Sequence, residues 1–244
     1  MRAAIVVVLL TAGVADARPF DKLQGGALLH YEVTGLHGIE DTRGETEAQD
    51  LVLAGFRLHG FVGMSSTIGY HIGIDLAAGS SLNAGGFAYD VAVFPVGVSA
   101  RFGRTGVVML GAGVGASGAV GTLDDAVTLP LELNAEIGDG RLRLLARVRT
   151  SYVAGADSRQ SAAPSIPFAD ELDATLGLRV GRHYEDWGMP SGNGYFLGVA
   201  YRELAGTRFL GLVLGYSIDG ATKRKEASKR HRGELYGCAD CDQP

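Results

Sequence analysis

The stretch LPLELNAEIGDGRLRLLARVRTSY, from Leu129 to Tyr152, contains two runs in which aliphatic and polar residues alternate. Successive side chains of a β-strand point to opposite faces of the sheet, so residues two positions apart share a face. The stretch therefore predicts two strands, each with one apolar and one polar face. The polar faces carry Glu132, Asn134 and Glu136 in the first run and Arg143, Arg147 and Arg149 in the second.

The Asp-Gly pair at 139–140 separates the two runs. Asp-Gly is a preferred pair for a two-residue hairpin turn, because both central residues adopt positive φ. With this pair as the turn, Glu136 faces Arg143 and Glu132 faces Arg147. The sequence thus predicts a hairpin whose charged rungs pair opposite signs.

The same alternation recurs along most of the chain. A change of phase at Pro95 indicates a β-bulge, because proline cannot donate to the strand ladder. Together with the two strands of the hairpin at 129–152, the number of alternating segments predicts a closed antiparallel up-and-down β-barrel of about ten strands, within a range of eight to twelve. The other segments are 27–34, 51–61, 68–78, 87–103, 108–115, 172–180, 195–202 and 210–216.

The N-terminus has the features of a secretory signal. Met1 and Arg2 precede a short apolar run, and Ala15 and Ala17 form an A-x-A cleavage site. A spanning helix needs about 20 apolar residues, so any membrane span must consist of strands. The 244 residues, with a formal net charge of −5, suit one domain. We divide the chain into a cleaved signal peptide (1–17), a linker (18–25), a barrel (26–218) and a basic tail (219–244).

Three features indicate that the apolar faces contact lipid and do not form the core of a soluble protein. The polar faces hold many glycines, which suit a crowded barrel interior, and no lysine lies between Lys22 and Lys223. Soluble sheet edges usually carry lysine, whereas arginine pairs with carboxylates in closed interiors. Aromatic residues on the apolar faces gather near strand ends, as in the girdles of membrane barrels. This predicted girdle comprises Tyr70, Phe87, Tyr89, Phe102, Tyr152, Tyr195, Tyr201 and Tyr216.

The polar faces then line a narrow lumen filled by ion pairs. Barrels of eight strands are just filled by side chains and water channels appear near sixteen, so we do not expect a wide porin. The expected lumen network comprises Glu132, Glu136, Arg143, Arg147, Arg149, Arg57, Arg101, Arg179 and Arg202.

Long and short connections alternate through the first seven strands, as in outer-membrane barrels. The segment 183–193 is long where a short turn is expected, and the segment 204–207 is short where a loop is expected. Either the barrel is irregular there, or the strand count is wrong by one.

Together, the signal, alternating strands, girdle and loop pattern resemble a small Gram-negative outer-membrane β-barrel, over residues 26–217. The resemblance implies outer-membrane lipid and lipopolysaccharide as surroundings, and a structural, adhesive or narrow-pore role. Two alternatives stay open: an outer-membrane barrel hydrolase acting on lipid or peptide, and a secreted soluble barrel that binds a small apolar ligand.

The best candidates for catalysis all project into the predicted lumen. With Met64 at the centre of its turn, Arg57 faces His71. A hydrogen-bonded network that fills the lumen explains these residues better than an active site, because buried charges must be paired in either case. The histidines show no metal-ligand spacing, and we expect neither metal nor cofactor. The catalytic candidates are His30, Glu32, His59, His71 and Asp75.

The tail after the last strand is basic and contains the only cysteines, Cys238 and Cys241. In an oxidising compartment, such a pair favours a local disulfide. The basic cluster suits acidic envelope polymers or lipid headgroups as partners, but a solvated, disordered tail explains it better. We expect no nucleic-acid partner, and the sequence does not define an oligomeric state.

Overall fold

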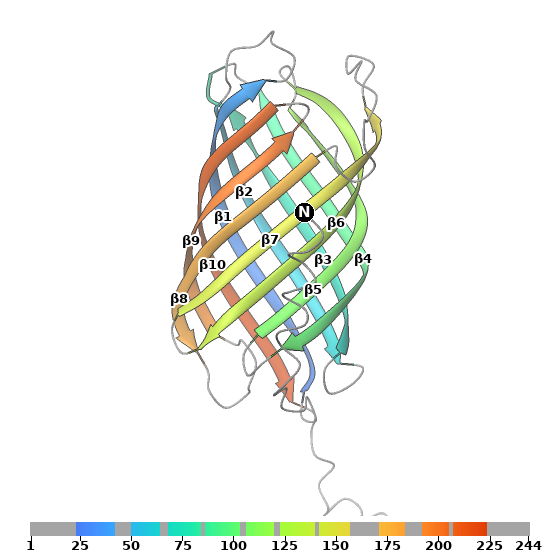
Figure 1. The fold of residues 1–244 in the computed structure, drawn as a ribbon, viewed down its shortest axis with the longest axis vertical. Coiled ribbons are helices and arrows are strands. Elements are labelled where there is room, and N and C mark those ends of the chain that lie inside the picture. Colours follow the sequence, from blue (N-terminus) through green and yellow to red (C-terminus); the bar gives the residue numbers. More distant parts are fainter. Residues whose placement is uncertain are drawn as a thin grey trace, which may run out of the picture.

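The computed structural model describes residues 23–41, 50–63, 68–83, 86–102, 106–119, 123–139, 142–156, 171–183, 192–204 and 207–223. These residues form ten β-strands, inclined to the long axis of the molecule (Figure 1). The strands are β1 (Leu23–Asp41), β2 (Asp50–Gly63), β3 (Ile68–Ser81), β4 (Phe87–Phe102), β5 (Gly106–Ala119), β6 (Leu123–Asp139), β7 (Leu142–Ala156), β8 (Glu171–His183), β9 (Gly192–Leu204) and β10 (Thr207–Lys223).

Each strand pairs antiparallel with its neighbours in sequence, and β1 pairs with β10 to close the sheet. The protein is therefore a closed up-and-down barrel, and the predictions of fold and strand count are confirmed. Within the described part of the chain, no helix is long and apolar enough to cross a membrane.

The two ends of the barrel are distinguished by the strands that begin and end there. β1 begins and β10 ends at one of them, which we call the terminal end. The opposite end, where β1 leads to β2, is called the loop end. Because ten strands form, the long segment between β8 and β9 and the short one between β9 and β10 are irregularities of connection length. They do not indicate a miscounted strand.

Side chains alternate between an apolar exterior and a polar interior, as the sequence predicts. In the first half of β3, exposed and buried residues alternate one by one. Leu144, Leu178 and Leu212 are 44%, 46% and 61% exposed, whereas Glu132 is 1% exposed. The predicted inside–outside assignment is confirmed.

The predicted irregularity at Pro95 is also present. The pairing of β4 shifts register between Val93 and Val96 on one side, and opposite Tyr70 and Gly73 of β3 on the other. Phe94 is buried, while Pro95 and Val96 are both exposed, so the alternation changes phase there. The prediction of a bulge is confirmed.

The predicted registers of three hairpins are wrong, each by an even number of residues. Asp139 pairs with Leu142, so the Asp-Gly pair is not the turn. In β2 and β3, Arg57 lies opposite Asp75 instead of His71. In β4 and β5, a three-residue turn at Arg104, Thr105 and Gly106 predicts Arg101 opposite Met109, whereas Arg101 lies opposite Val107. An even shift keeps every side chain on its face, so the alternating pattern cannot detect it.

The strands also extend beyond the predicted limits of the barrel. β1 begins at Leu23 and β10 ends at Lys223, outside the expected 26–218. The predicted signal peptide, the basic tail and its Cys238–Cys241 pair lie outside the described residues. The backbones of Arg101 and Phe102 pair with β5, but their side chains are likewise outside the description.

Apolar side chains fill part of the lumen, which the sequence analysis did not anticipate. They form one buried cluster, mainly near the loop end, where β1 and β9 end and β2 and β10 begin. We call it the apolar layer. It comprises Leu36, Leu51, Leu53, Ala88, Phe196, Ala200, Leu204, Phe209 and Val213.

Candidate functional site in the lumen

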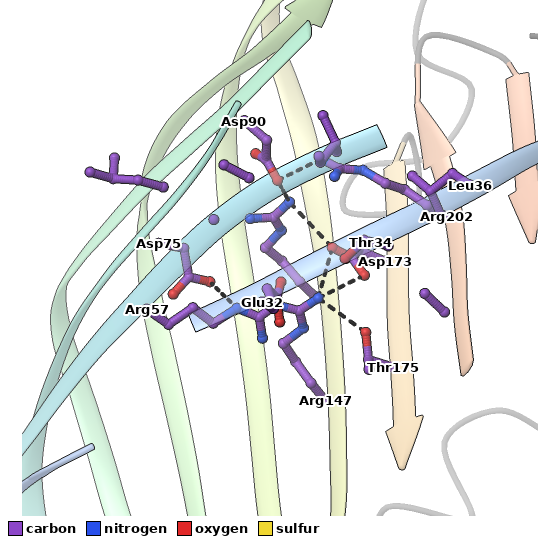
Figure 2. Close-up of a pocket in the computed structure, with 16 residues that line it drawn as sticks. Glu32, Thr34, Leu36, Arg57, Asp75, Asp90, Arg147, Asp173, Thr175 and Arg202 are labelled. Atoms are coloured by element: carbon purple, nitrogen blue, oxygen red, sulfur yellow. Dashed lines mark hydrogen bonds and ion pairs between the residues drawn. The ribbon is translucent and has the colours of Figure 1, made fainter. Parts of the chain in front are cut away.

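Below the apolar layer, charged side chains from seven strands meet in the middle of the barrel (Figure 2). We call this set the central network. Its side chains are almost fully removed from solvent and point toward one another across the lumen. The network consists of Glu32, Arg57, Asp75, Asp90, Arg147, Arg149, Asp173, Thr175 and Arg202.

Asp90 joins opposite walls of the barrel. Its Oδ2 atom accepts hydrogen bonds from Arg149 of β7 and from Arg202 of β9, the latter at 2.5 Å. In the strand order of the barrel, β5 and β6 lie between β4 and β7. These bonds therefore cross the lumen instead of following the sheet.

Arg147 binds a partner that the sequence analysis did not predict. Its NH2 atom donates to Asp173 Oδ1 at 3.2 Å and to Thr175 Oγ1 at 3.1 Å, both on β8. The expected Glu132–Arg147 pair is absent, because Glu132 lies opposite Arg149 in the ladder. Arg57 donates to Glu32 at 2.5 Å.

A second ion cluster lies toward the terminal end. Glu136 Oε1 accepts hydrogen bonds from Arg143 NH1 at 2.8 Å and from Arg179 NH1 at 3.1 Å. The predicted contact between Glu136 and Arg143 is therefore made by the side chains, although Glu136 lies opposite Leu145 in the backbone ladder. All three side chains are buried.

Two histidines and two carboxylates form a third buried group, the histidine cluster. His59 Nε2 lies 2.7 Å from Asp75 Oδ1 and 3.8 Å from Glu132 Oε1. The other ring nitrogen of His59 lies 2.9 Å from His71 Nε2. The rings of His59 and His71 are stacked with their centroids 5.1 Å apart.

His30 lies apart from the histidine cluster. Its Nε2 atom is 3.3 Å from Glu32 Oε2, and its ring meets the edge of Phe196 at a centroid distance of 5.2 Å. Of the five catalytic candidates, the structure therefore brings together His59, His71 and Asp75, and places His30 with Glu32.

Inward-facing glycines make room for these rings. A Cβ atom on Gly73 would lie 2.8 Å from His59 Nδ1, and one on Gly97 would lie 2.8 Å from His71 Nδ1. A Cβ atom on Gly177 would lie 2.5 Å from the ring of Phe196. The lumen is as crowded as the glycine-rich polar faces suggested.

The lumen histidines are sealed. His30, His59 and His71 are 6%, 1% and 0% exposed. A barrel hydrolase requires an exposed histidine beside a carboxylate or a serine at one rim. None of these three meets that condition, so the predicted constellation gives no support to the hydrolase alternative.

The predicted girdle residues whose side chains are described lie on the outer face. Tyr70, Tyr195 and Tyr216 lie toward the terminal end, and the rings of Tyr195 and Tyr216 meet at 5.2 Å. Tyr31, which pairs with Tyr216, belongs to the same band and was missed. The remaining members, Phe87, Tyr89, Tyr152 and Tyr201, lie toward the loop end.

One polar pair on the outer face was also missed. His37 Nδ1 lies 2.6 Å from Asp50 Oδ1 at the loop end, and the His37 side chain is 70% exposed. The pair borders an open apolar groove of about 710 Å³, lined by residues of the outer face that include Val33, Leu210 and Leu212. The predicted strand at 27–34 ends before His37, whereas β1 continues to Asp41.

Comparisons with known proteins show likeness in structure only. No family model matches the chain, and no curated protein matches it. The translocator domain of the autotransporter NalP from Neisseria meningitidis is 9% identical, with coverage of 89% of this chain and 94% of that domain and a TM-score of 0.40. The beta domain of the Bordetella autotransporter BrkA is 14% identical, with 80% and 99% coverage and a TM-score of 0.37.

The monoaromatic hydrocarbon channel CymD is 8% identical, with 83% and 90% coverage and a TM-score of 0.32. The description of this chain as a closed barrel rests on its own strand pairing.

Proposed function

We propose that the protein is a sealed β-barrel of the Gram-negative outer membrane, with a structural role. The outer wall supports a membrane location, since Leu178, Leu197 and Leu214 are 46%, 58% and 60% exposed. An outer wall of exposed apolar side chains is unfavourable in water. A closed barrel can lie in lipid because it satisfies its backbone hydrogen bonds without solvent. The same exposure argues against the secreted soluble barrel.

The filled lumen carries the structural role. Asp90, Arg149 and Arg202 cross it, and the apolar layer packs above them. Among the described residues, one lumen cavity within the central network has a volume of about 30 Å³, and a neighbouring one has a volume of about 60 Å³. Each has room for roughly a few water molecules, which is too little for a continuous hydrated path.

Single-channel recording in planar lipid bilayers tests this proposal. The purified barrel should insert without producing regular conductance steps. A variant with Asp90→Ala and Arg202→Ala removes side chains from the middle of the lumen and should show frequent openings. The matched control, Leu214→Ala, changes only the outer face and should stay silent. Stable openings in the wild-type barrel would contradict the sealed lumen and favour a narrow pore.

The surroundings follow from the same proposal. Lipid and lipopolysaccharide cover the outer wall. With ten strands, β1 begins and β10 ends at the same end of the barrel, and we assign that end to the periplasm on the expectation of a secretory signal before β1. There, the basic tail binds acidic envelope polymers through its lysines and arginines.

A surface lipid hydrolase is the second candidate, and the exposed His37–Asp50 pair favours it. A carboxylate can orient a histidine that acts as a general base, and the adjacent apolar groove has room for an acyl chain. Ser80 lies on β3, opposite Val52 of β2, so Asp50 of β2 lies between His37 of β1 and Ser80 in the order of the strands. In a catalytic triad the histidine lies between the serine and the carboxylate. This arrangement therefore has the wrong order for a serine nucleophile.

Hydrolysis of phospholipid in mixed micelles decides between the two candidates. The wild-type barrel should release no fatty acid above the rate of a His37→Ala variant. A clear difference between these two proteins would establish the enzyme and displace the structural role.

A further inference from the structure

We propose that His59, Asp75 and Glu132 bind one divalent transition-metal ion of the Zn²⁺ type inside the barrel. Each residue offers a ligand atom, and these atoms all lie within 4.8 Å of one another. The three residues are 1%, 5% and 1% exposed, so the site is closed to bulk solvent. It goes beyond the sealed-barrel role, because a lumen can be filled without a metal.

Two carboxylate oxygens in this cluster are buried without a hydrogen-bond donor. Glu132 Oε2 and Asp75 Oδ2 both lack one. Arg57 Nε is 3.9 Å from Asp75 Oδ2, which is beyond hydrogen-bond distance. Burying a carboxylate is costly unless a charge compensates it, and a bound ion is one of the explanations for such unsatisfied atoms. A divalent cation between the two carboxylates would supply that charge.

The spacing of the ligand atoms suits a small ion. Zinc binds nitrogen and oxygen at about 2.0 to 2.2 Å in a tetrahedron, which places neighbouring ligand atoms roughly 3.3 Å apart. His59 Nε2 lies 2.7 Å from Asp75 Oδ1 and 3.8 Å from Glu132 Oε1, values that bracket this separation. An imidazole ligand favours zinc over magnesium or calcium, which prefer oxygen alone.

His71 positions the ring of His59 for this role. A metal on His59 Nε2 leaves the proton on Nδ1, which can donate to His71 Nε2 at 2.9 Å. Metal-bound histidines usually donate their other ring N–H to such a partner, which fixes the ring and its tautomer. The lack of a side chain at Gly73 allows the ring to occupy this place, because a Cβ atom would lie 2.8 Å from it.

The ion would connect strands that do not pair with one another. His59 and Asp75 come from the paired strands β2 and β3, whereas Glu132 lies on β6, with β4 and β5 between them in the barrel order. Metal binding at this position braces the barrel from inside. A protein that binds a ligand only when folded gains stability from it, so the metal should raise the melting temperature.

A second explanation would also account for the buried carboxylates in this cluster. A proton shared between the carboxyl groups of Asp75 and Glu132 would also relieve their repulsion, with no metal present. The experiment must therefore measure bound metal directly.

The full chain is refolded in detergent with Zn²⁺, passed over a chelating resin and analysed for zinc by mass spectrometry. Cys238→Ser and Cys241→Ser are introduced in every sample, because the C-x-x-C in the tail could itself bind zinc. We expect close to one zinc per chain and a higher melting temperature than after refolding with a chelator. Glu132→Gln and Asp75→Asn should lose both effects.

Glu136→Gln is the matched control, because Glu136 is also buried in the lumen but bonds to Arg143 and Arg179. This variant should keep its zinc. Zinc far below one per chain in the parent protein, with no change in melting temperature, would overturn the proposal in favour of the shared proton. Equal zinc in Glu132→Gln and Glu136→Gln would also overturn it. If both site variants fail to refold, the zinc content and melting temperature of the parent protein still decide.

Discussion

Glu132 of β6 lies directly opposite Arg149 of β7, two residues beyond the arginine that an Asp139–Gly140 turn would have placed there. The β6–β7 ladder from Thr128 to Asp139 shares this offset, so Leu133 faces Val148 instead of Ala146. The offset frees Glu132 for the histidine cluster and leaves Arg147 to bind β8.

Cross-linking checks this register. With the natural cysteines replaced by serine, Leu133→Cys combined with Val148→Cys should form a disulfide on mild oxidation. Directly opposed residues lie about 4.5 to 5.5 Å apart between Cα atoms, within the range that a disulfide spans. Leu133→Cys with Ala146→Cys is the control, because diagonal positions are roughly 7 to 8 Å apart. Cross-linking of the control pair alone would restore the turn at Asp139–Gly140.

Arg147→Leu should destabilise the barrel more than Leu144→Val. Arg147 donates to Asp173 and Thr175 in the lumen, and breaking a buried ion pair costs about 3 to 5 kcal/mol. Asp173 keeps Arg149 at 3.5 Å, which places the expected loss near the lower limit of that range. Leu144 faces outward, where loss of a methylene costs about 1 kcal/mol. Urea unfolding in lipid vesicles measures both, and equal stability would mean that the lumen is wet enough to solvate Asp173.

Leu214→Arg and Phe87→Arg should differ because they lie at different depths. Leu214 lies near the middle of β10, and Phe87 begins β4 at the loop end; both are exposed on the outer wall. An arginine facing lipid costs about 2 to 4 kcal/mol at the bilayer midplane and about 0 to 1 kcal/mol near the interface. Unfolding free energies measured in vesicles should show this gap. Similar losses for the two variants would argue against a bilayer around this wall.

The sequence predicts the barrel and its two faces well because both depend on parity. A strand that alternates keeps the same residues inside under any even shift of register. The register of a hairpin depends on which residues form its turn. The turn preference of Asp-Gly gave the wrong register for β6 and β7, because Asp139 still belongs to β6. Pairings such as Glu132 with Arg147 and Arg57 with His71 failed for this reason, although all four residues do face the lumen.

The apolar layer and the hydrogen bonds across the lumen could not be predicted from the sequence, for a different reason. Strand alternation shows that Asp90 and Arg202 both face inward, but not that they meet, because 112 positions separate them and the barrel must close first. Phe196 had a usable signal: Gly194 and Gly198 flank it at two residues on the same face, and a Cβ atom on Gly198 would lie 2.8 Å from its ring. Small residues beside an inward aromatic predict a ring in the lumen.

Gly73 has no side chain, which leaves room for the ring of His59. Gly73→Ala places a Cβ atom 2.8 Å from two atoms of the His59 ring, so the ring must shift from its present position beside Asp75 and Glu132. Overpacking of this kind costs about 1 to 3 kcal/mol. Gly35→Ala is the control, because a Cβ atom there meets nothing within 4 Å. It should be neutral or stabilising by up to about 1 kcal/mol, since alanine restricts the unfolded chain. Urea unfolding of both variants in the same vesicles gives the comparison. If Gly73→Ala were as stable as Gly35→Ala, the His59 ring would not be held against β3, and the positioning of its Nε2 atom between the two carboxylates would have to be abandoned.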